Sequence, residues 1–230
     1  MSDFSSWGPT YDLKLKPEIT AHGGEITSTV PGGYGEQSGT SMASPNMAGV
    51  MAIIRNYIKA LALRTGGTAD EQTIAQNVLA LVKDANGNID PVKLNRLANQ
   101  LIMSTATMVK DQAGRTYSPR KQGAGLGSLE NVVSQTQAFL STDLESNLQA
   151  GDYTADGRPK LELGDDPEMK GEYTMSFNLT NFGVSELVFT TNHLVLTETI
   201  AKSGLAVAEQ SYTLSPDAVV WSVDGNEVGE

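Results

Sequence analysis

Between residues 41 and 63 hydrophobic side chains fall on nearly every side of a helical wheel, and this stretch constrains the fold more than any other feature. A helix that is apolar all round must be buried in a protein core or in a membrane. Arg55, Asn56 and Lys59 interrupt the stretch, which argues against a membrane span. The sequence therefore predicts a long helix buried in a core, with Pro45 in its first turn, where a missing backbone N–H costs nothing.

The distribution of charge divides the chain into two modules. Residues 1–141 carry 12 basic and 11 acidic side chains, a net charge of +1, whereas residues 142–230 carry 4 and 16, a net charge of −12. We therefore expect two domains, 1–141 and 142–230, with different surfaces. Neither has a basic stripe, which argues against a nucleic-acid partner. The absence of cysteine excludes disulfides and thiolate metal sites.

The first module mixes strand-like and helical segments, which is typical of an α/β domain. Thr68 and Glu71 have the spacing of a capping box, and Asp90 stands before a proline at a helix start. The predicted elements are strands at 16–21 and 25–30, the long helix, and further helices at 68–83, from 90 onward, and at 129–140.

After residue 142 the pattern changes to short β-prone segments. Residues 172–180 alternate polar and apolar side chains, and further short apolar runs follow without a helical period. Such a series predicts a partial all-β sandwich.

Ser41 is the residue best placed for chemistry. A serine hydroxyl is weakly nucleophilic at neutral pH, so it needs a base and backbone N–H donors that face a developing oxyanion. At the start of a helix, Ser41 would lie beside unpaired N–H groups and the positive end of the helix dipole. Gly39 and Ala43 are small enough for a substrate to approach. Position alone favours an ordinary capping serine at a helix start over a nucleophile.

Three motifs before and around Ser41 closely resemble the subtilisin-like serine proteases, or subtilases. These are Phe4-Ser5-Ser6-Trp7-Gly8-Pro9, Lys16-Pro17-Glu18-Ile19-Thr20-Ala21 and Gly39-Thr40-Ser41-Met42-Ala43-Ser44-Pro45. Residues 101–107 and 117–125 are similar to the closing helix and loop of the same catalytic domain. The chain most resembles the lactocepin-like cell-envelope proteinases, in which a fibronectin-type-III-like β-sandwich follows the protease domain. The resemblance thus implies the C-terminal part of a parallel-sheet domain with flanking helices, and then the partial sandwich.

The resemblance implies roles for the residues around the nucleophile. Ser41 would be the nucleophile, with its own N–H in the oxyanion hole, and Gly39 and Thr40 would form the nucleophile loop. The family's aspartate, its histidine and its oxyanion asparagine have no match in this chain. The parent would be a serine endopeptidase acting on peptides or proteins, extracellular or attached to a bacterial cell envelope. This chain alone is expected to be inactive, with its partner the missing N-terminal part of the catalytic domain.

His22 is the one histidine close to Ser41 in the sequence, and it stands where the family usually has proline. A Ser41–His22 dyad is an alternative, but the family takes its base from another segment, and the loss of proline is better explained as a relaxed loop. A second alternative is a non-catalytic adhesion or scaffold protein that retains a degenerate protease core. In either case the loss of most of a parallel sheet predicts an uncovered apolar face and self-association.

Other candidate sites have simpler structural explanations. Asp84 to Asp90 resembles the start of a calcium loop, but the required glycine and bidentate glutamate are missing, which favours a polar turn. Residues 123–127 lack the context of a dinucleotide fingerprint. The acidic cluster Asp165-Asp166-Glu168 is typical of a solvated loop, and His193 has no partner ligand. We therefore expect no metal or cofactor in this chain, and the sequence leaves calcium in a longer parent open.

Overall fold

A computed structural model describes residues 1–12, 14–135, 137–142, 158–162, 168, 170–200, 207–212 and 219–228. By their internal contacts, the residues form two compact units, Met1–Val184 and Ser185–Glu230. Asp165 and Asp166 of the acidic cluster lie outside the described residues. Within the described part of the chain, no helix is long and apolar enough to cross a membrane.

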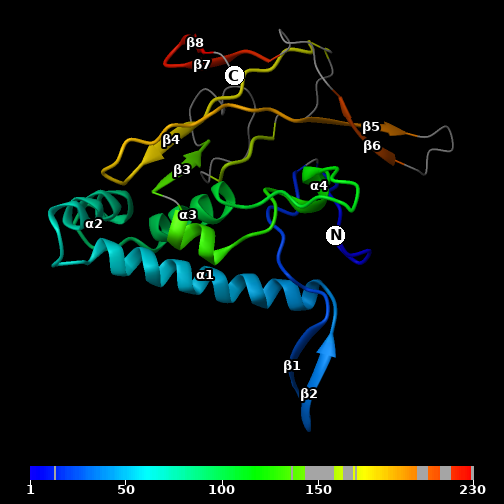
Figure 1. Ribbon diagram of the computed structural model, residues 1–230, viewed down its shortest axis with the longest axis horizontal. Helices are drawn as coiled ribbons and strands as arrows, with labels where there is room; N and C mark the ends of the chain where they lie inside the picture. The colour runs from blue at the N-terminus through cyan, green and yellow to red at the C-terminus, as the bar shows by residue number, and fades with distance from the viewer. Residues whose placement is uncertain are drawn as a thin grey trace. The chain divides into compact units, whose positions relative to one another are not determined.

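The long helix, α1, extends from Thr40 to Ala62 and confirms the predicted helix (Figure 1). Pro45 is its sixth residue, so the prediction that this proline lies in the first turn is wrong. A proline has no backbone N–H, and the Ser41 carbonyl, four residues earlier, therefore lacks its usual helical donor. Pro45 therefore interrupts the helical hydrogen bonding of α1 at the carbonyl of Ser41, the candidate nucleophile.

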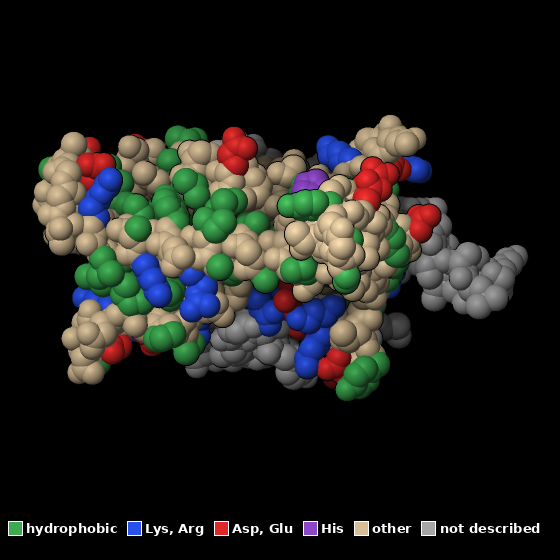
Figure 2. Space-filling model, turned by 90° about the horizontal axis from the view of Figure 1, so that it is seen from below, with side chains coloured by type: hydrophobic (Ala, Val, Ile, Leu, Met, Phe, Trp, Pro, Cys, Tyr) green, Lys and Arg blue, Asp and Glu red, His purple; other side chains and the backbone are tan. Residues whose placement is uncertain are grey.

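The prediction that α1 is buried on all sides is also wrong. Within α1 the buried residues are Ile54, Ile58 and Ala62, spaced four apart on a single face. Ile53 is 51% exposed, and the alanines at 48, 52 and 60 are exposed with it. Figure 2 shows hydrophobic side chains gathered along this helix. The uncovered apolar face that the sequence predicts is therefore present, and it lies on α1.

The core of the first unit forms where α1 meets two further helices, α2 (Ala69–Val82) and α3 (Pro91–Ser104). The capping box is confirmed, because Glu71 N donates to Thr68 Oγ1 at 3.2 Å and Thr68 N donates to Glu71 Oε2 at 2.9 Å. Asp90 caps α3 by accepting from Val92 N at 2.7 Å. The most deeply buried hydrophobic side chains include Ile54, Ile58, Val78, Val82, Leu94, Leu101 and Val132.

A two-stranded hairpin precedes α1 and projects away from the helices of its unit (Figure 1). Its strands are β1 (Ile26–Val30) and β2 (Gly33–Gln37), which confirms the predicted strand at 25–30. They pair antiparallel through a tight turn at Pro31-Gly32, where Gly32 has a φ of 90°. Proline and then a glycine with positive φ is the favoured sequence of a type II turn.

The last part of the first unit differs from the predicted helix at 129–140. The chain forms a short helix α4 (Pro119–Gln122), one π-helical turn η1 (Asn131–Gln135) and then strand β3 (Ala138–Ser141). β3 pairs antiparallel with β4 (Asn178–Asn181), and Phe139 lies against Phe182 with ring centroids 6.5 Å apart. A distant strand therefore decides the conformation, and local helical spacing does not.

Among the described residues, the named strands form four separate antiparallel pairs. The predicted strand at 16–21 is reduced to an isolated parallel bridge between Thr20 and Leu126. Helices and strands together agree with an α/β fold. The extended parallel sheet stays a prediction.

The second unit contains two antiparallel hairpins. One joins β5 (Val195–Ile200) to β6 (Val207–Tyr212), and the other joins β7 (Trp221–Val223) to β8 (Asn226–Val228). Because β4 pairs with β3, residues up to Val184 group with the first unit. The β-sandwich and the domain boundary after residue 141 stay predictions.

Candidate active site

Ser41 lies in the first turn of α1, as its second residue, and it is exposed. Helix geometry gives the N–H groups of Thr40 and Ser41, the first two residues of α1, no acceptor within the helix. Gly39, the N-cap residue, has φ 157° and ψ 168°, a conformation that is essentially restricted to glycine. No side chain caps this helix end. The start of α1 therefore combines an exposed hydroxyl with backbone donors and the positive end of the helix dipole.

The nucleophile loop is held by a close backbone contact with Gly23. Gly39 N donates to Gly23 O at 2.7 Å, and Gly39 O in turn accepts from Met42 N at 3.0 Å. Gly23 is buried, and a Cβ at this position would lie 2.6 Å from Gly39 O and 2.9 Å from Ala43 Cβ. The contact therefore requires glycine at position 23, and it fixes where α1 begins.

The segment that leads to Gly23 pairs with the loop that follows α4. Thr20 N donates to Gly125 O at 2.8 Å, and Gly127 N donates to Thr20 O at 3.0 Å. On its other side this loop pairs with Thr107 through two hydrogen bonds between Thr107 and Leu126, of 3.0 and 2.8 Å. Three segments that resemble subtilase motifs are thus adjacent beneath the nucleophile loop.

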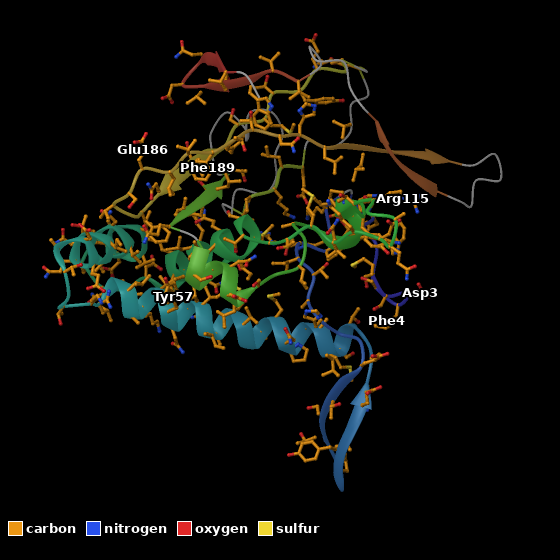
Figure 3. The ribbon with its side chains drawn as sticks, in the orientation of Figure 1. Asp3, Phe4, Tyr57, Arg115, Glu186 and Phe189 are labelled. Carbon is orange, nitrogen blue, oxygen red and sulfur yellow. The ribbon has the colours of Figure 1, made fainter. Side chains whose placement is uncertain are left out.

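The N-terminal motif is attached to α4. Gly8 N donates to Arg120 O at 2.8 Å, and Arg120 Nη1 donates back to Gly8 O at 3.1 Å. Lys121 Nζ lies 3.7 Å from the centre of the Trp7 ring, a cation–π contact. The neighbouring Asp3 and Phe4 project from the same N-terminal loop (Figure 3).

A buried ionic cluster holds the side chain of Glu18, in the segment 16–21, and sequence reasoning did not find it. Lys160 Nζ is 2.8 Å from Glu162 Oε1 and 3.2 Å from Glu18 Oε1. The side chains of Lys160 and Glu162 are 5% and 4% exposed. Arg158 also pairs with Glu18, and burial lowers the pKa of Arg158. Because Glu18 is far from Lys160 and Glu162 in the sequence, no local spacing could indicate the cluster.

His22 is exposed and precedes Gly23, so it belongs to the segment that contacts the nucleophile loop. Among the described residues, no hydrogen bond joins its side chain to Ser41. The structure therefore gives the alternative dyad no geometric support.

The segment from Asp84 to Asp90, which resembles the start of a calcium loop, is a polar turn, as predicted. The Asp84 carboxylate accepts from Asn86 N and Asn88 N, each at 2.8 Å. Across the described ranges, no group of three His, Cys, Asp or Glu side chains is arranged to hold a metal ion.

Tyr57 projects from the C-terminal third of α1 (Figure 3). It is half-buried, and burial raises the pKa of its phenol. Its hydroxyl is therefore neutral at physiological pH, and Tyr57 contributes no charge to the helix.

Comparison with known proteins assigns the chain to a class of peptidases. Residues 1–125, just over half of the chain, match the model of the subtilase family, and the chain belongs to this family. It is similar to the PI-type proteinase of Lactococcus lactis subsp. cremoris, with 32% identity over 200 residues that cover 82% of this chain and 9% of that protein.

Two further relatives come from other bacteria. The minor extracellular protease Vpr of Bacillus subtilis (strain 168) is 28% identical over 80% of this chain and 20% of its own length. The C5a peptidase of Streptococcus pyogenes is 30% identical over 64% of this chain and 11% of its own length. The chain therefore spans between 9% and 20% of the length of these relatives. All three are named as proteases, which supports a protease function.

Proposed function

We propose that this chain carries the nucleophile of a serine endopeptidase and that Ser41 is that nucleophile. The observation that carries the proposal is the exposed Ser41 in the first turn of α1, held in place through the Gly39–Gly23 contact. This segment lies within the residues that match the subtilase family.

The proposed reaction is acyl transfer. Ser41 Oγ attacks the carbonyl carbon of a peptide bond while a base takes the hydroxyl proton. The tetrahedral intermediate collapses when the leaving amine accepts that proton, and the acyl group stays on Ser41 Oγ. Water then attacks the ester in the same way and releases the acid.

The start of α1 can stabilise the oxyanion of both steps. The Ser41 N–H and the helix dipole supply positive potential without reorganisation, and the Thr40 hydroxyl adds a further interaction in the nucleophile loop. The glycine conformation at Gly39 leaves room for the substrate carbonyl, because no side chain stands at that position.

The 230 residues contain two histidines, and neither lies in a His-Gly-Thr motif. We therefore propose that the base, its aspartate and the oxyanion asparagine belong to an N-terminal part of the catalytic domain outside these residues. The exposed apolar face of α1 supports this, because a second layer of structure would cover it. In the complete domain we expect a parallel sheet at this face, and we expect the chain alone to be inactive.

The remaining expectations concern the parent protein. We propose that the strands of the second unit belong to a fibronectin-type-III-like sandwich, and that the parent is extracellular or attached to the cell envelope. Calcium binding in the parent is open, and no cofactor is needed for the proposed acyl transfer. The substrate class is peptide or protein.

A fluorophosphonate probe tests the nucleophile. In the longer protein that contains this chain, we expect labelling of the wild type and of Ser44→Ala, and no labelling of Ser41→Ala. Ser44 is a matched control because it is also exposed in the first turns of α1. Equal labelling of Ser41→Ala and the wild type would refute the role of Ser41. Rapid labelling of the 230-residue chain by itself would refute the proposal that the base lies elsewhere.

A further inference from the structure

The hairpin before α1 has two outer edges, and neither is paired with another strand among the described residues. An uncovered strand edge presents backbone N–H and C=O groups that can pair with an extended peptide. Figure 3 shows the hairpin projecting away from the helices of its unit. The strand register determines which backbone groups each edge offers.

The outward groups of β2 belong to Tyr34 and Glu36. Val30 pairs with Gly33 across a two-residue turn, so this pair exchanges both of its backbone hydrogen bonds. The pattern alternates along an antiparallel ladder, which makes Gly35 with Ser28 the next bonded pair. Tyr34 and Glu36 lie between the bonded pairs, and their N–H and C=O groups therefore point away from β1.

Strand β2 ends close to the proposed nucleophile in the chain. Gln37 ends the strand four residues before Ser41, and four extended residues span at most about 14 Å. A peptide lying along β2 would therefore reach the start of α1 within a few residues of its paired segment. The opposite edge, with Thr27 and Thr29, belongs to β1. Along the chain β1 is separated from Ser41 by the whole of β2, and it reaches the start of α1 only through the Gly23–Gly39 contact before the strand.

The side chains on the edge are exposed and chemically distinct. Tyr34 is 79% exposed, and Glu36 is exposed on the same face two residues later. Opposite charges on adjacent strands attract, and an aromatic side chain packs well against an apolar or β-branched neighbour. The pair therefore favours a peptide with a basic residue next to Glu36.

We propose that the outer edge of β2 binds an extended segment of the peptide substrate as an added strand, through the backbone of Tyr34 and Glu36, with a preference for a basic residue opposite Glu36. This proposal rests on the proposed function for its substrate class. It concerns binding and not the chemical step, so each can fail without the other.

The test measures binding to the 230-residue chain, with Ser41→Ala in every sample so that hydrolysis does not contribute. The probe is a blocked, fluorescent peptide that alternates Val with Lys, compared with the same peptide carrying Glu in place of Lys. Glu36→Pro removes the outward N–H of β2, and Thr27→Pro removes the outward N–H of its cross-strand partner on the other edge. The amides of Ser28 and Gly35 report whether the hairpin itself persists.

We expect the Lys peptide to protect the Tyr34 and Glu36 amides from hydrogen exchange. Glu36→Pro should weaken binding about fivefold to tenfold, whereas Thr27→Pro should leave it unchanged. Glu36→Lys keeps the backbone and should reverse the preference between the Lys and Glu peptides by about twofold to fivefold in each direction. Protection on β1, equal loss in both proline variants, or no protected amide on β2 would overturn the proposal.

Discussion

Replacement of Gly23 by alanine tests how the nucleophile loop is held. A Cβ at Gly23 would lie 2.6 Å from Gly39 O and 2.9 Å from Ala43 Cβ, whereas ordinary contacts begin at 3.4 Å. The neighbours must therefore move by about 0.5 to 0.8 Å. Two of the three nearest atoms are backbone, so rotation of a side chain cannot relieve the contact.

The expected cost follows from the range for overpacked positions. We expect Gly23→Ala to lower the free energy of unfolding by about 1–3 kcal/mol. For a unit of this size each kcal/mol shifts Tm by about 2–4 °C, so the melting temperature should fall by about 2 to 12 °C. The same displacement should slow fluorophosphonate labelling of Ser41 in the complete catalytic domain that we propose, because the Ser41 N–H moves with Gly39.

Gly24→Ala is the matched control. Gly24 is the next residue, it is exposed, and the nearest atom to its added Cβ is Ser2 Oγ at 3.9 Å. Neither glycine has a positive φ, so the two substitutions differ in packing and not in backbone strain. Urea unfolding and thermal melts of both variants decide the matter. If both substitutions lower the free energy of unfolding by the same small amount, the Gly23–Gly39 contact does not position the start of α1.

Three further predictions concern stability. Thr68→Ala should lower the free energy of unfolding by about 1 kcal/mol in urea, because it removes the cap of α2, while Thr73→Ala in the same helix should change it less. The pKa of Glu71 is lowered, chiefly because the Thr68 backbone N–H donates to its carboxylate. The ionised Glu71 therefore contributes its full stabilisation of the folded state above its ordinary pKa of 4.5, and this stabilisation is lost as the pH falls through the lowered pKa of the folded protein. Thermal melts at a series of pH values should show that Glu71→Gln reduces the loss of stability at acid pH. An unchanged loss would contradict the stabilising role of the ionised Glu71. Glu18→Gln should cost about 2–3 kcal/mol, less than for a fully buried ion pair because Glu18 is 22% exposed, whereas the exposed Glu130→Gln should be neutral in the same urea assay.

The features that sequence predicted well are those decided within a few residues. The capping box at Thr68, the Asp90 cap and the strand at 25–30 each depend on neighbours in the chain, and all three are confirmed. The prediction failed at 129–140, where β3 replaces a helix because β4, far along the sequence, supplies its hydrogen-bond partner. Local spacing carries no information about such a partner.

The candidate site shows the same division. The motif around Ser41 could be identified from its residues, and so could its place at the start of a helix. The backbone contacts that hold the nucleophile loop could not be identified in this way, because Gly23, Gly125 and Thr107 meet through hydrogen bonds between segments that are distant in the sequence. The cluster of Glu18, Lys160 and Glu162 was missed for the same reason.

By itself the sequence determined the family, the serine that is its candidate nucleophile and the helix that carries it, because those depend on residue type and short-range spacing. Only the tertiary structure decided which face of α1 is buried and where Pro45 falls in the helix. It also decided that Gly23 fixes the first turn. Burial and close backbone contact depend on which distant segments meet, and a linear pattern does not encode that until the chain folds.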